Sequence, residues 1–183
     1  MMKELALHIL DIMENSIRAK ASKISVSLVE DSQSNQFILT IQDNGKGMDQ
    51  EVLARVKDPF FTEQNKKVGM GIPLLEQLTS LCGGELTIDS QPGKGTSIRA
   101  TFQRNHIDLP PLGNLPETLM VVYASHPEIE IEYEHVKDNC RWSFNTKKMS
   151  QELGLQGPQD ILPVLQSIKE WIQYQENQIQ EGV

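Results

Sequence analysis

The sequence is poor in several kinds of residue, and each shortage excludes a class of protein. Only two of its 183 residues are cysteine, too few for a secreted scaffold held by disulfides. Cys82 ends an apolar segment before a glycine pair, which predicts a reduced thiol in the core. No run of eighteen apolar residues and no secretory signal is present, so we expect neither a membrane protein nor an exported one, but a cytoplasmic one.

Basic residues are scarce in the second part of the chain. Residues 1–105 carry 12 basic and 13 acidic side chains, whereas residues 106–183 carry 5 and 12, so nearly all of the net charge of −8 arises there. This excess of acid argues against nucleic acid as a partner. It suits a basic protein partner, or it serves solubility alone. A stretch rich in proline and glycine over 105–117 further predicts two domains, 1–105 and an acidic α/β module at 106–183.

The first informative block is a predicted helix over 3–20 with a wide apolar arc. Its narrow polar stripe holds Asp11, Asn15 and Arg18 at a spacing of i, i+4 and i+7, so the three side chains share one side. They offer a carboxylate, an amide oxygen and a guanidinium, which suit a water, a hard cation and a phosphate. The alternative is a solvated helix face, but the wide arc favours a stripe that faces a groove.

The second block follows an alternating run at 37–42 that predicts a strand. Asp43 stands at the end of this strand, where a carboxylate can accept a hydrogen bond from the amino group of adenine and would disfavour guanine. Gly45 and Gly47 permit positive φ and let the backbone approach a ligand closely. An Asn-Gly turn within a simple hairpin would give the same pattern.

The third block is a polar segment with Phe60 and Phe61 as expected anchors, followed by Lys66 and Lys67. We expect residues 49–67 to form a mobile lid over a triphosphate, with hinges at Gly47, Gly69 and Gly71. An apolar helix follows, and its N-terminus is a natural anion site. Ordinary surface solvation is the alternative for each lysine.

The second half of the chain carries no recognisable chemistry. The apolar residues at 118–123 indicate a buried strand or helix. Residues 128–134 alternate between apolar residues and glutamate. With 142–144 that run predicts a hairpin, followed by a helix after Gly157. The row of glutamates is either a site for a cation or partner, or a solvated face of a sheet.

Together the blocks of the first half resemble the Bergerat-fold ATP-binding domain of histidine kinases, DNA gyrase, the large heat-shock chaperone and mismatch-repair ATPases. Residues 8–19 resemble the N box, 43–48 the first glycine box, 58–62 the phenylalanine box, 69–75 the second glycine box and 93–98 the closing strand motif. The phenylalanine box and closing motif favour the histidine-kinase branch. The resemblance covers roughly residues 5–102 and implies a two-layer α/β sandwich, with a mixed sheet covered by helices.

The resemblance also implies roles for particular residues. Binding of ATP or ADP would fall to the following: Asn15, Arg18, Asp43, Gly45, Gly47, Lys66, Lys67, Gly69, Gly71 and Thr96. Asn15 would hold Mg²⁺, and Thr96 would support Asp43 at the adenine through its hydroxyl or a water. Asp11 stands where related ATPases have a glutamate that activates water. Its side chain is one methylene shorter, which argues against efficient hydrolysis.

Three functions compete on these grounds. No histidine stands in the sequence context of a phosphoacceptor, and the chain begins almost at the N box, so we expect a stand-alone protein. It would transfer phosphate to a separate protein partner, hydrolyse ATP slowly, or sense nucleotide without turnover. A homodimer is compatible with each of these functions. His8 is expected to be a helix residue at the edge of the pocket.

Overall fold

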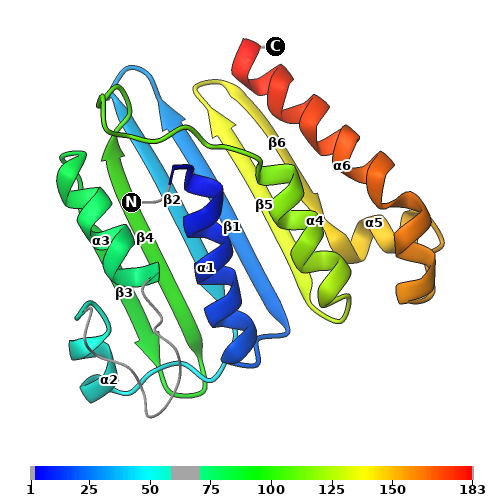
Figure 1. Cartoon of the computed structure of the whole chain (residues 1–183), viewed down its shortest axis with the longest axis horizontal. Coiled ribbons are helices and arrows are strands. Elements are labelled where there is room, and N and C mark those ends of the chain that lie inside the picture. The colour runs from blue at the N-terminus through cyan, green and yellow to red at the C-terminus, as the bar shows by residue number, and fades with distance from the viewer. Residues whose placement is uncertain (1–2, 59–70, 183) are drawn as a thin grey trace.

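The computed structural model describes residues 3–58 and 71–182. Each alternating or amphipathic stretch of the sequence forms an element of the expected type (Figure 1). The elements are α1 (Leu5–Arg18), β1 (Lys23–Asp31), β2 (Gln36–Asp43), α2 (Gln50–Arg55), α3 (Gly71–Leu81), β3 (Leu86–Gln91), β4 (Gly95–Gln103), α4 (Leu115–Ser125), β5 (Glu130–Lys137), β6 (Cys140–Asn145), α5 (Thr146–Glu152) and α6 (Pro158–Glu181).

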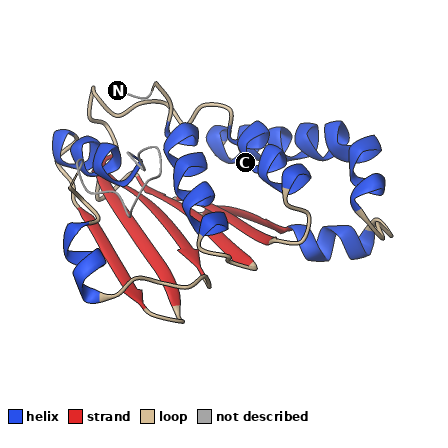
Figure 2. Cartoon of the chain, turned by 60° about the horizontal axis from the view of Figure 1, so that its bottom comes forward, coloured by secondary structure: helices blue, strands red, loops and turns tan. Residues whose placement is uncertain are grey.

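The strands form one six-stranded mixed sheet in the order β3-β4-β2-β1-β5-β6. Among the described strands, β1 and β5 run parallel and the other neighbours are antiparallel. Helices α1, α3, α4 and α6 lie on one side of the strands (Figures 1 and 2). This arrangement confirms the predicted α/β sandwich with a mixed sheet.

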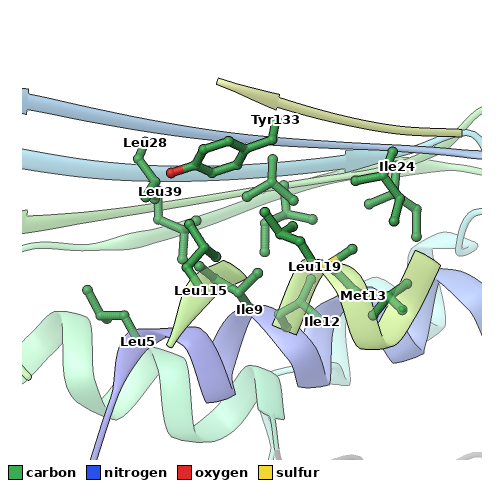
Figure 3. Close-up of a cluster of buried hydrophobic side chains, with 14 of the residues drawn as sticks. Leu5, Ile9, Ile12, Met13, Ile24, Leu28, Leu39, Leu115, Leu119 and Tyr133 are labelled. Atoms are coloured by element: carbon green, nitrogen blue, oxygen red, sulfur yellow. The ribbon is translucent and has the colours of Figure 1, made fainter. Parts of the chain in front are cut away.

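The core lies between the sheet and this helical layer (Figure 3). Alternation places every second residue of β1 inside, including Ile24 and Leu28, which are fully buried. They face Ile9 of α1 and Leu119 of α4, which are also fully buried. Cys82 is buried too, as expected for a core thiol.

The predicted boundary at 105/106 falls between β4 and α4, and both the sheet and the core continue across it. Strand β5 pairs with β1 from Lys23–Glu130 to Glu30–Lys137. The segment before α4 also caps α1, because the amide groups of Leu5 and Ala6 donate to the carbonyls of Pro111 (3.0 Å) and Leu112 (2.9 Å). Residues 118–123, for which the sequence predicts either a strand or a helix, belong to α4.

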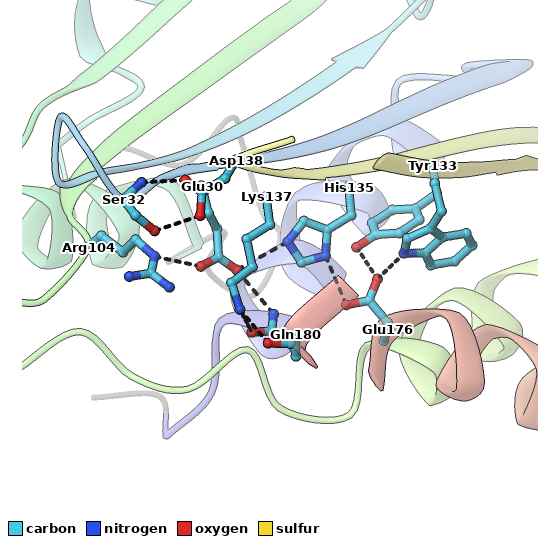
Figure 4. Close-up of polar contacts among 10 residues, drawn as sticks. Glu30, Ser32, Arg104, Tyr133, His135, Lys137, Asp138, Glu176 and Gln180 are labelled. Atoms are coloured by element: carbon cyan, nitrogen blue, oxygen red, sulfur yellow. Dashed lines mark hydrogen bonds and ion pairs between the residues drawn. The ribbon is translucent and has the colours of Figure 1, made fainter. Parts of the chain in front are cut away.

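A buried polar network fixes α6 to the sheet (Figure 4). The ring of His135 lies between Glu176 of α6 (2.9 Å) and Glu30 of β1 (3.2 Å). The Tyr133 hydroxyl donates to Glu176 (2.7 Å), and Arg104 donates to Glu30 (2.8 Å). Each buried carboxylate is therefore paired and hydrogen-bonded, as burial of a charge requires.

No helix in the described part of the chain combines the length and the apolar character needed to span a bilayer. The longest one, α6, carries polar side chains along much of its surface.

Candidate functional site

Asp43 ends β2 in the middle of the sheet, between Ile24 of β1 and Thr96 of β4. Its half-buried carboxylate accepts the hydroxyl of Ser16 from α1 (2.8 Å) and the amide of Gly45 (2.8 Å). These bonds use one acceptor position on each oxygen, and an ionised carboxylate has about two on each. The carboxylate is thus held in a fixed orientation while it keeps the capacity to accept a further donor.

The loop after Asp43 packs tightly against the end of α1. A Cβ on Gly45 would lie 2.8 Å from both the Cβ and the carbonyl oxygen of Ala19. The amide of Lys46 donates to that same carbonyl (2.9 Å). Gly45 does not adopt the positive φ that glycine permits, and close approach to α1 is what requires glycine there.

Gly47 adopts the positive φ that glycine permits, at +66°. A Cβ there would lie 2.0 Å from the carbonyl oxygen of Gln91, at the end of β3. Both glycines of this loop are therefore needed for contacts within the chain, whether or not a ligand also approaches them.

Thr96 lies beside Asp43 in the β2–β4 ladder, but its hydroxyl contacts Ser90 of β3 (2.9 Å). Ser90 also donates to the carbonyl of Gly95 (3.0 Å) and accepts the amide of Met48 (2.8 Å). The Thr96 hydroxyl thus contacts Ser90 rather than Asp43, and support of the adenine by Thr96 through a bridging water stays a prediction. Ser90 and Ser16 are polar residues of the site that the sequence reasoning did not identify.

Asp11 faces the start of α3. A Cβ on Gly71 would lie 2.9 Å from the Cβ of Asp11, so α3 begins directly against this part of α1. Burial raises the pKa of Asp11, Glu14 raises it further, and Arg18 lowers it in part. A carboxylate with a raised pKa holds a proton more strongly and is a better general base near neutral pH.

Asn15 and Arg18 contact each other on the same stripe. Arg18 donates to the amide oxygen of Asn15 (3.2 Å) and forms an ion pair with Glu14 (2.7 Å). Asn15 is half-buried and Arg18 is exposed. The described residues contain no group of three or more His, Cys, Asp or Glu that could hold a metal alone. A hard cation at Asn15 would therefore take its other oxygens from a ligand or water.

His8 lies one turn before Asp11 and is more buried than expected. Its side chain is 1% exposed, and neither ring nitrogen has a hydrogen-bond partner among the described residues. Burial lowers the pKa of this ring and favours its neutral form.

The remaining site predictions concern Phe60, Phe61, Lys66, Lys67 and Gly69, which lie outside the described residues. Of the expected lid, 49–58 is described. It contains α2, whose N-terminus is capped by the side chain of Asp49 accepting the amide of Val52 (2.8 Å).

Comparisons with known proteins concern the family of this part of the chain. The family model described as histidine kinase-, DNA gyrase B- and HSP90-like ATPase matches residues 3–106. Sporulation kinase C of Bacillus subtilis is 30% identical over 93 residues, which are 51% of this chain and 22% of that protein. The signal transduction histidine-protein kinase AtoS of Escherichia coli is 32% identical over 92 residues, 49% of this chain and 15% of that protein. The matches thus span less than a quarter of either relative.

Among solved structures, the N-terminal domain of a DNA repair protein is similar with a TM-score of 0.52. The alignment covers 78% of this chain and 52% of that one, at 13% identity. At this identity the similarity concerns the fold alone.

Proposed function

The chain belongs to the histidine kinase-, DNA gyrase B- and HSP90-like ATPase family, and we propose that it binds ATP with Mg²⁺ and acts on a separate protein partner. Its action would be transfer of phosphate to that partner or signalling of the nucleotide state. The observation that carries the proposal is the oriented carboxylate of Asp43, with spare acceptor capacity at the end of a central strand. The similarity to catalytic domains of histidine kinases supports a function related to phosphate transfer.

The carboxylate of Asp43 supplies adenine specificity in this proposal. A carboxylate accepts the amino group of adenine, whereas guanine presents an oxygen there and would be repelled. The bonds from Ser16 and Gly45 keep the acceptor oriented before the nucleotide arrives, which lowers the ordering cost of binding.

The phosphates would lie between α1 and the start of α3. The N-terminus of α3, which begins at Gly71, offers amide groups that have no partner within the helix itself and the positive end of the helix dipole. Mg²⁺ would be held by the amide oxygen of Asn15 and would neutralise phosphate charge when bound. Arg18, together with Lys66 and Lys67, would add positive charge around the same phosphates.

Slow hydrolysis is the second candidate, and Asp11 is the observation that favours it. Its half-buried carboxylate, with a raised pKa, stands against the start of α3, where it could take a proton from an attacking water. Its short side chain limits that reach, so we expect turnover by the isolated chain to be slow or absent. Sensing without turnover remains the third alternative.

Calorimetry with ATP and GTP tests the ligand. We expect wild type to bind ATP and to discriminate against GTP, and Asp43→Ala to lose about one to two decades of ATP affinity. That loss corresponds to a charge-assisted hydrogen bond of about 1.5–3 kcal/mol. Asp89→Ala is the matched control, because Asp89 is an exposed carboxylate on β3. Equal affinity for ATP and GTP, or full ATP affinity in Asp43→Ala, would refute the assignment.

Labelled ATP separates the three activities. With the protein alone we expect little free phosphate and no label on the chain. Steady turnover that disappears in Asp11→Asn would establish the ATPase instead. Acid-labile label on the chain would reveal an acceptor histidine within it.

A further inference from the structure

Strand β6 is the outermost strand on one side of the sheet, and the described part of the chain supplies no strand beyond it. The hydrogen bonds of β5 show towards which neighbouring strand the amide and carbonyl of each residue point. The amide of Glu130 donates to the carbonyl of Ser22, just before β1. The amide of Ile131 donates to the side-chain hydroxyl of Thr146, just after β6. Odd-numbered residues of β5 therefore direct their backbone groups towards β6.

The register carries this alternation onto β6. Tyr133 lies opposite Phe144, and His135 lies opposite Trp142, so these two residues of β6 use their backbone groups inside the hairpin. Arg141 and Ser143 then direct their amides and carbonyls outward, and so does the amide of Asn145, whose carbonyl belongs to the N-cap of α5. The side chains of Arg141 and Ser143 are exposed, which agrees with an open edge. Such a row of unpaired groups is a template for another strand.

The helical side of this edge is aromatic and partly open. The rings of Trp142 and Phe144 contact Trp171 of α6, with centroids 5.8 and 6.5 Å apart. Trp171 is nevertheless 44% exposed, and Tyr174 on the next turn is 59% exposed. A hollow of about 990 Å³ beside β6 is lined by Phe144 and Trp171, and also by residues of the other face of the strands, among them Glu132, Glu134 and Ser143. Side chains of an added strand would find both space and apolar surface there.

We propose that the occupant of this edge is a second copy of the chain, paired antiparallel through β6 with a two-fold axis at Ser143. This register uses all three outward residues, because Ser143 meets the partner's Ser143 and Arg141 meets the partner's Asn145. It also brings Trp142 opposite the partner's Phe144, twice by symmetry. A two-fold contact needs such a self-complementary patch.

The composition of the edge favours a copy of itself. Aromatic pairs at directly opposed positions stabilise antiparallel strands. Arg141 is the one charged residue of β6, and in this register it faces an amide rather than a second arginine. The net charge of −8 therefore does not create a like-charge contact across the paired strands. The dimer would continue the sheet across the axis and leave the proposed nucleotide site, on the far side of β1, untouched.

Analytical ultracentrifugation over a concentration series without nucleotide tests the proposal. We expect wild type to dimerise and Ser143→Pro to weaken the dimer at least tenfold. Proline removes an outward amide and leaves the bonds to β5 intact, so the hairpin should survive. Ser143→Thr is the matched control and should dimerise like wild type. Circular dichroism and ATP binding should be unchanged in both variants, which separates this result from failure of the proposed function.

Disulfide trapping tests the register itself. In a Cys140→Ser background, Ser143→Cys should form a covalent dimer under mild oxidation. Hydrogen-bonded antiparallel pairs have Cα atoms about 5.5 Å apart, within the range of a disulfide. Ser80→Cys in the same background places an exposed cysteine on α3 and should not crosslink. A wild type that stays monomeric at all concentrations, a dimer unaffected by Ser143→Pro, or equal crosslinking at both cysteines would overturn the proposal. A monomer that binds extended peptides through β6 would mean that a different protein occupies the edge.

Discussion

Two features require glycine at position 47: its left-handed backbone conformation and the lack of space for a Cβ. Its φ of +66° disfavours any other residue, and a Cβ would also collide with the carbonyl oxygen of Gln91 at 2.0 Å. Gly93, on the neighbouring turn, has a φ of +75° and open space where a Cβ would be. The two positions thus share the backbone conformation and differ in the collision.

We predict that Gly47→Ala destabilises the protein clearly more than Gly93→Ala. The left-handed conformation should cost each variant about 1–2 kcal/mol, and Gly47→Ala must in addition shift the backbone of β3. Urea unfolding of both variants measures the difference. Equal midpoints would show that the loop moves away from Gln91 at little cost.

Asn15 allows a test of the metal at the residue scale. We predict that Asn15→Ala loses the Mg²⁺ dependence of triphosphate binding and keeps the fold, because its amide oxygen is the proposed protein ligand. Calorimetry with ATP, with and without Mg²⁺, measures the effect. Glu14→Ala is the control, since it removes the ion pair of Arg18 but leaves Asn15 in place. Unchanged metal dependence in Asn15→Ala would mean that the stripe is only a surface.

Sequence reasoning at this scale identified Asp43 as a strand-end carboxylate but not the residues that hold it. Ser16 lies 27 positions away, and its contact with Asp43 depends on how α1 crosses the sheet. Ser90 belongs to a strand paired with β4, so its bond to Thr96 depends on a register that local patterns do not specify. Residue types alone carried no signal for either contact.

At the scale of elements, His135 connects β1, β5 and α6. Burial lowers the pKa of His135, but its hydrogen bonds to Glu176 and Glu30 outweigh this and raise the pKa to about 9. Burial raises the pKa of Glu30, but hydrogen bonds from His135, Arg104 and Gln180 lower it to about 2. A protonated histidine therefore lies between two carboxylates at neutral pH.

This pairing predicts how stability depends on pH. The folded pKa of His135 is above its unfolded value, so its contribution is complete below about pH 6.5 and is lost as pH rises through 9. The contribution of Glu30 is complete above about pH 4.5 and is lost as pH falls towards 2. Both contributions are therefore present together between about pH 4.5 and 6.5.

We predict that the free energy of unfolding of wild type falls between pH 6.5 and 9 and that His135→Gln removes most of this slope. Denaturant unfolding at several pH values measures it. His126→Gln is the matched control, because His126 lies at the partly exposed end of α4. The same slope in His135→Gln and wild type would contradict the assignment.

The strand pattern of residues 128–134 was sufficient to predict β5 and its hairpin with β6, and both are confirmed. It was not sufficient to predict that β5 lies parallel to β1. Alternation shows which residues of a strand face the core, but not which strand it pairs with. Helix α4 was ambiguous because it is buried on most sides, and a mostly apolar helix lacks the period that marks an amphipathic one.

At the scale of the whole molecule, residues from both sides of position 105 build one sheet and one core. Leu115 and Leu119 of α4 are fully buried in the same cluster as Ile9 and Met13 of α1. The helix that carries Asp11 and Asn15 is thus packed against a segment beyond the matched family region.

We predict that deleting residues 108–183 strongly destabilises the remaining chain. The deletion removes β5, the parallel neighbour of β1, and the carbonyls that cap Leu5 and Ala6. It also exposes the apolar surface under Leu115 and Leu119, at about 1.5–3 kcal/mol for each such side chain, against a typical total stability of about 5–15 kcal/mol. Far-UV circular dichroism and urea unfolding measure the loss.

Fragment complementation provides the control for this deletion. If the two segments fold as one body, adding residues 108–183 as a separate fragment should restore the unfolding midpoint and ATP binding together, because the missing strand and helices supply the same contacts in trans. If residues 1–105 form a domain of their own, as the division of composition predicts, the truncated chain will bind ATP with the affinity of the full chain and gain nothing from the fragment. The parallel β1–β5 pairing and the capping of α1 lead us to expect the first result.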